Sequence, residues 1–164
     1  MARTTADSTV TLSVLDRLID REPKNQSEAP LNRSQSERQL KVAVQRDLEW
    51  LLNTRRIFEE PDEELKEVNR SVYNYGLPDF SQYTTASQSD QSKLIREVVA
   101  AIKTYEPRLA NVRIVPLESS VVQQFHVRIE GLLLMDPSPQ PVSFDTVIGL
   151  KSGTSRISGG ASAG

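Results

Sequence analysis

The sequence predicts an α+β fold in which three main helices pack on one face of a small antiparallel sheet of about three strands. Two observations support this prediction. Apolar residues recur at helical spacing up to Tyr105, and after Pro107 they alternate with polar residues as they do in strands. A chain that runs through its helices before its strands favours separate helical and sheet layers.

The composition fits one domain of ordinary size with tails. The chain has 164 residues, of which 37% are hydrophobic, and a net charge of −2, so nothing indicates a nucleic-acid surface. Cysteine is absent and His126 is the single histidine, so we expect neither a metal nor a cofactor. The start of the chain lacks a signal peptide, and the apolar run at 132–135 is too short to span a bilayer. We therefore expect a soluble cytoplasmic protein without direct membrane insertion.

Residues 1–35 read as a flexible N-terminal segment with a short amphipathic helix at 12–20, followed by a folded domain at 36–150. The short helix must pack on the domain or on a partner, because it is unstable alone. The first strong helix is expected to begin near Ser34, which has capping-box spacing to Glu37. Its apolar stripe consists of Leu40, Val44, Leu48, Leu51 and Leu52.

A second, shorter helix is expected after Pro61, with Gly76 closing it in a left-handed conformation and Leu65, Val68 and Val72 along its face. A third helix covers 89–105. Strands are then predicted at 112–116, 125–135 and 142–150. Residues 151–164 are rich in Ser, Gly and Ala and read as a disordered tail, whose removal should have little effect.

The corner between helix and sheet carries the most informative motif, YEPRL at 105–109. Pro107 has no N–H and pushes the residue before it out of the helical region, so the helix must end there. Glu106 and Arg108 lie on one side of an extended segment and can pair. The corner is expected either to brace the domain or to dock a partner.

Four motifs occur in order along the chain: LDRL at 15–18, RDLEWLLNTRR at 46–56, SVYNYGLPDF at 71–80 and YEPRL at 105–109. Together they resemble TssE, the small baseplate subunit of bacterial type VI secretion systems. That family is related to the wedge and sheath-initiator proteins of contractile phage tails. The resemblance covers about 12–150, and the Asn-Thr-Arg-Arg end of the first helix favours the secretion branch.

The resemblance implies a structural subunit that joins the baseplate wedge to the contractile sheath. Its expected partners are TssF and TssG, with TssK in the same complex, and the sheath proteins TssB and TssC. Its expected place is the cytoplasmic side of a membrane-docked baseplate. The family's Glu-Pro-Arg motif maps onto Glu106, Pro107 and Arg108, which are expected to bind a partner.

Two further groups of residues are candidates for partner binding. The aromatic loop offers Tyr75, Leu77 and Phe80, although these side chains could equally close the core over the loop. The strand at 142–150 is expected at a sheet edge free of proline, which favours addition of a partner strand. Its residues in this role are Val142, Phe144, Thr146 and Ile148.

An enzyme is the main alternative, because the related phage family carries a lysozyme label. A peptidoglycan glycosidase needs two carboxyls across a sugar cleft, one of them kept protonated. A cation two residues from Glu106 favours the ionised form instead, and nothing pairs it with Glu118 or Glu130. We therefore expect no catalytic residues. A wedge protein of a contractile phage tail is the second alternative.

Overall fold

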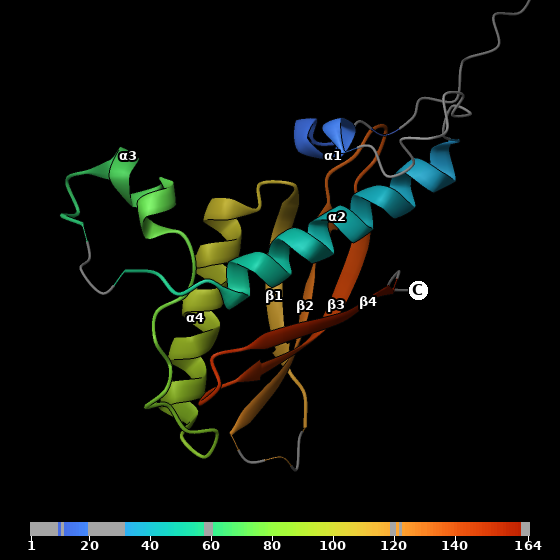
Figure 1. Ribbon diagram of the computed structural model, residues 1–164. Coiled ribbons are helices and arrows are strands. Elements are labelled where there is room, and N and C mark those ends of the chain that lie inside the picture. Colours follow the sequence, from blue (N-terminus) through green and yellow to red (C-terminus); the bar gives the residue numbers. More distant parts are fainter. Residues whose placement is uncertain are drawn as a thin grey trace, which may run out of the picture.

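The computed structural model describes residues 10, 12–19, 32–57, 61–118, 121 and 123–161 (Figure 1). The helices are α1 (Val14–Leu18), α2 (Arg33–Asn53), α3 (Lys66–Asn69), the 3-10 helix η1 (Val72–Asn74) and α4 (Gln88–Tyr105). The strands are β1 (Leu109–Pro116), β2 (Gln124–Leu133), β3 (Gln140–Gly149) and β4 (Ser155–Ala161). They form one antiparallel sheet in the order β1-β2-β3-β4, so the α+β prediction is confirmed with one strand more than expected.

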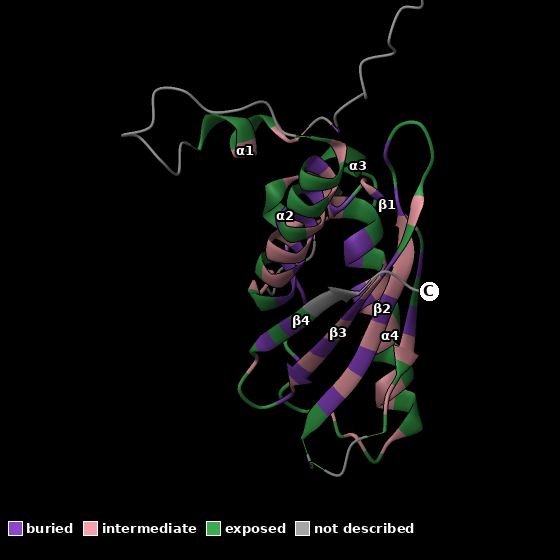
Figure 2. Cartoon of the chain, turned by 90° about the vertical axis from the view of Figure 1, so that its right-hand side faces the viewer, coloured by how far each residue is buried: buried purple, intermediate pink, exposed green. Residues whose placement is uncertain are grey.

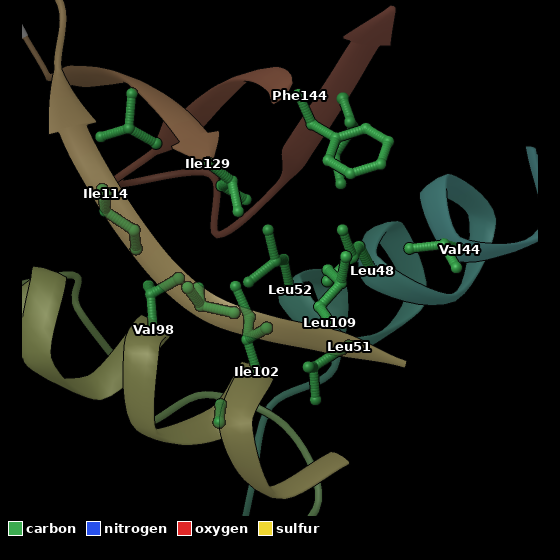
Figure 3. Packing of buried hydrophobic residues seen from close by; sticks show 14 of the residues in the cluster. Val44, Leu48, Leu51, Leu52, Val98, Ile102, Leu109, Ile114, Ile129 and Phe144 are labelled. Carbon is green, nitrogen blue, oxygen red and sulfur yellow. The ribbon is translucent and has the colours of Figure 1, made fainter. Parts of the chain in front are cut away.

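The two long helices cover one face of the sheet, with α2 against β4 and α4 against β1. Burial alternates along the strands, so every second residue of β2 and β3 faces the helices and the others face outward (Figure 2). The core between these layers joins Leu48 and Leu52 of α2, Ile102 of α4, Ile129 of β2 and Phe144 of β3 (Figure 3).

The first strong helix begins at Arg33, close to the predicted start near Ser34, but the predicted capping box of Ser34 and Glu37 is wrong. Asn32 is the N-cap: its Oδ1 accepts from the Gln35 N–H at 2.9 Å, and Gln35 Oε1 accepts from the Asn32 N–H at 3.0 Å. Ser34 donates to Asn32 instead of pairing with Glu37. Asparagine is among the strongest N-cap residues, and here it caps the helix two residues before the predicted cap.

The second predicted helix is shorter than its apolar pattern indicates, since α3 and η1 have no buried residue. Leu65 is 52% exposed and Val72 is 89% exposed, because Leu77 and Phe80 of the following loop fill the core in their place. Gly76 does adopt a positive φ of 108°, and a Cβ there would lie 2.5 Å from the Thr54 carbonyl oxygen. Only glycine therefore lets this loop approach the end of α2.

The prediction of a disordered tail from 151 onward is wrong over 151–161, because 155–161 form β4; residues 162–164 lie outside the described residues. β4 pairs with β3, and Ile157 is 5% exposed in the core. The predicted open edge at 142–150 is therefore also wrong, since β3 lies between β2 and β4. The segment is ordered despite its low apolar content by pairing with β3, by burial of Ile157 and by three hydrogen bonds between its main chain and α2 side chains.

The N-terminal helix was expected at 12–20 and is observed as α1, with 20 outside the described residues. Val10 is 9% exposed in the core cluster, and its N–H donates to Ser36 Oγ at 3.1 Å. The start of the described chain is thus attached to α2 by both packing and a hydrogen bond. Most of the predicted linker at 22–35 lies in the part that is not described.

Candidate partner-binding surfaces

The helix-to-sheet corner contains the ion pair that the sequence predicts. α4 ends at Tyr105, and Glu106 caps it in a non-helical conformation ahead of Pro107. Arg108 Nε donates to Glu106 Oε1 at 2.6 Å, and Arg108 Nη2 donates to Glu106 Oε2, which is the bidentate geometry of a guanidinium on a carboxylate. Glu106 is only 3% exposed, so the corner is a rigid, ion-paired unit.

This ion pair is part of a larger corner charge cluster, which consists of Asp16, Arg46, Asp47, Glu106 and Arg108. Arg108 Nη2 also donates to Asp47 Oδ2 at 2.6 Å, and Arg46 bridges Asp47 Oδ1 at 2.8 Å and Asp16 Oδ1 at 2.7 Å. Three of the four sequence motifs meet in the cluster. The contacts from Asp16 to Arg46 and from Asp47 to Arg108 span 30 and 61 residues, so motif order alone could not reveal them.

The charges of the cluster stabilise one another. The hydrogen bonds that Arg108 donates to Glu106 and Asp47 raise the pKa of Arg108 against the opposing effect of burial. Burial raises the pKa of Asp16, but hydrogen bonds from Ser13 and Arg46 outweigh it, so the net effect is a lowered pKa. About a quarter of each of the Arg46, Asp47 and Arg108 side chains remains exposed, so the cluster presents charge at the surface.

The aromatic loop lies beside this corner, but two of its three candidate residues belong to the core. Leu77 and Phe80 are fully buried, which agrees with the alternative that they close the core over the loop. Tyr75 is partly exposed and packs edge-on against Tyr105 with ring centroids 5.1 Å apart. Burial raises the pKa of Tyr75, with smaller contributions from Asp47 and Glu106.

The four candidate residues of the third predicted strand also face the core. Val142, Phe144, Thr146 and Ile148 are each at most 2% exposed. The hydroxyl of Thr146 is buried and has no hydrogen-bond partner among the described residues. These side chains position the sheet, and the main chain of β3 is occupied by strands on both sides.

The outer edges of the sheet belong to β1 and β4. Both strands pair irregularly with their neighbour, and for β4 the register to β3 shifts between Phe144 and Asp145. β1 carries an irregularity between Ala110 and Arg113, with Asn111 at a φ of 53°, and ends at Pro116. Both features blunt an edge against strand addition. Sequence reasoning missed the β4 edge, whose glycine-rich second half has no residue of high strand propensity.

Other kinds of site find little support within the described ranges. No group of three or more His, Cys, Asp or Glu residues there is arranged to hold a metal ion. None of the helices there combines the length and apolar composition that a bilayer crossing requires. A cavity of about 120 Å³ lies between α4 and the α3–η1 region, with Arg56 and Glu97 forming an ion pair in its wall. It is too small for an oligosaccharide substrate.

Comparison with protein families gives a match to the family of baseplate wedge protein gp25 over residues 38–138. The chain belongs to this family. TssE belongs to the same family, so the resemblance seen in the motifs is confirmed. The family match supports a structural role in the baseplate of a contractile tail. A search of curated proteins and a search of solved structures found no match. The matched region includes α4 and the Glu106–Arg108 corner but ends before β3 and β4.

Proposed function

We propose that this member of the gp25 family is the small baseplate subunit of a type VI secretion system, and that it joins the baseplate wedge to the contractile sheath. Family membership supports the baseplate role, and the Asn-Thr-Arg-Arg sequence after the α2 stripe favours the secretion branch over the phage branch. In this role the subunit works on the cytoplasmic side of a membrane-docked baseplate. A phage-tail wedge protein is the alternative within the family.

The corner charge cluster is the observation that carries the proposal. Arg108 donates hydrogen bonds to both Glu106 and Asp47, and the exposed part of its guanidinium can bind an acidic group of a partner. Because the cluster is held by five charged groups from three elements, it offers a fixed geometry that costs little ordering on binding. We assign this surface to the wedge proteins TssF and TssG, with TssK in the same complex.

The β4 edge is the second surface of the proposal. Addition of an extended partner segment to an exposed edge gives affinity through main-chain hydrogen bonds. With β3 interior, strand addition from the sheath proteins TssB and TssC is assigned to β4. β1 is the poorer acceptor, because it ends at Pro116, which has no N–H to donate, and holds Asn111 at a positive φ.

The same geometry opposes an enzymatic role. A glycosidase acid must stay protonated until it acts, whereas Glu106 and Asp47 both accept hydrogen bonds from a guanidinium. The carboxylates therefore act as ion-pair partners. We propose a structural protein without catalytic activity on peptidoglycan.

Co-purification with TssF and TssG tests the wedge surface. Arg108→Ala should lose the wedge proteins, and Arg108→Lys should recover them only in part, because lysine keeps the charge without the bidentate geometry. Arg128→Ala is the matched control, since Arg128 forms an ion pair with Asp145 at 2.7 Å on the open face of the sheet. Wedge binding by a folded Arg108→Ala variant at the level of the parent would contradict this assignment.

Sheath nucleation tests the β4 surface. A chain that ends at Ile157 keeps its buried isoleucine but lacks 158–164, which includes the glycine-rich half of the edge. We expect it to bind TssF and TssG normally and to fail in nucleating a TssB–TssC sheath. Normal nucleation by this chain would assign the sheath contact elsewhere.

A further inference from the structure

The first half of the β4 edge is already occupied by side chains of α2. Asn53 Oδ1 accepts from the Ser155 N–H at 2.6 Å, and Asn53 Nδ2 donates to the Ser155 carbonyl at 2.8 Å. Gln45 Nε2 donates to the carbonyl of Ile157 at 3.1 Å. α2 packs against β4 (Figure 1), and both amides belong to side chains of this helix.

These groups are the ones that an added strand would use. Residues of an antiparallel pair alternate between bonding to the neighbouring strand and turning away from it. The Gly149 N–H donates to the Thr154 carbonyl at 2.8 Å, so Thr154 is a residue that bonds to β3. Counting along the register, Arg156 also faces β3, whereas Ser155 and Ile157 turn their main-chain groups away from it. Asn53 therefore makes the same pair of hydrogen bonds with Ser155 that a residue of a fifth strand would make.

We infer that Gln45 and Asn53 form an edge guard, which closes the first half of β4, from Ser155 to Ile157, to incoming strands. An unprotected edge invites pairing with another chain, and natural proteins cover such edges. Here the covering groups are side chains on a helix, and they compete directly with an added strand. The guard thus limits pairing between free copies of the subunit and makes any partner strand begin beyond Ile157.

The inference concerns the same edge as the proposed sheath contact, and it rests on that proposal only for the identity of the incoming strand. Its test therefore uses the isolated protein. The double variant Gln45→Ala, Asn53→Ala should self-associate about tenfold more tightly than the parent, because the freed groups of Ser155 and Ile157 become available to a second copy. Gln39→Ala is the matched control, since Gln39 is an exposed glutamine on the same helix.

Sedimentation velocity across a concentration series measures the association, and circular dichroism checks the fold. The single variant Gln45→Ala takes the place of the double variant if the latter unfolds. Hydrogen exchange of the Ser155 amide is the second measurement: exchange should be slow in the parent and fast in Asn53→Ala. Unchanged self-association of a folded variant, or unchanged protection of Ser155, overturns the edge guard. If the parent protein fails to bind sheath but the variants change self-association and Ser155 exchange as expected, only the proposed function is contradicted.

Discussion

The corner charge cluster and the β4 edge are two surfaces built in opposite ways. The corner uses side-chain charges that are satisfied by one another, with Glu106 buried beneath Arg108. The edge uses main-chain groups, of which the first half is covered by Gln45 and Asn53. A charged surface becomes rigid when its charges pair with one another. A sheet edge that could pair with other chains is protected when side chains cover part of its main chain.

The largest effect is expected from removing the strand that carries the edge. Deleting 152–164 removes Ile157, which is 5% exposed, and leaves the main-chain groups of β3 that pair with β4 open to solvent. We expect the free energy of unfolding to fall by well over about 3 kcal/mol, since loss of a buried isoleucine side chain alone costs that much. Urea unfolding measures the change. Stability equal to that of the parent would mean that β4 is not part of the folded domain.

The next effect concerns the corner. Glu106→Ala leaves Arg108 with one carboxylate partner in a partly buried site, so we expect a loss of about 3 kcal/mol in the free energy of unfolding. Asp145→Ala is the matched control, because Asp145 pairs with Arg128 on the open sheet face, where both side chains are more than 40% exposed. The control should unfold like the parent. Equal stability of Glu106→Ala and Asp145→Ala would show that the corner is no stronger than a surface ion pair.

Local sequence patterns predict contacts between near neighbours in the chain and not contacts between distant residues. The corner was therefore predicted and the β4 edge was missed. Glu106 and Arg108 are two residues apart and Pro107 fixes the backbone between them, so local rules determine their pairing. Strand β4 has one large apolar residue, and its order comes from pairing with β3 and from the amides of α2. The latter contacts span more than 100 residues and leave no local pattern.

Acid should loosen the corner where α1 joins it. Asp16 has a lowered pKa in the folded state, so its stabilising effect is complete above its ordinary value of 3.8 and is lost as the pH falls through the lower folded value. Trp50 is the single tryptophan, and Arg46 lies 5.0 Å from its ring centroid, so its fluorescence reports this contact. We expect an emission change below pH 3.8 in the parent and not in Asp16→Asn. The same transition in both proteins would assign it to another carboxyl.

The smallest effect is expected beneath the β4 edge, at Thr146. Thr146 lies opposite Ile157 and is 1% exposed, and within the described part of the chain its hydroxyl has no hydrogen-bond partner. Burying an unsatisfied hydroxyl costs free energy, so Thr146→Val should stabilise the protein by about 1 kcal/mol with nearly the same shape. Thr146→Ser is the control, because it keeps the hydroxyl, loses a buried methyl and should destabilise. Thermal unfolding measures both variants. If Thr146→Val were clearly destabilising, the hydroxyl would have a partner in solution, and the interior beneath the edge would depend on polar contacts as the corner does.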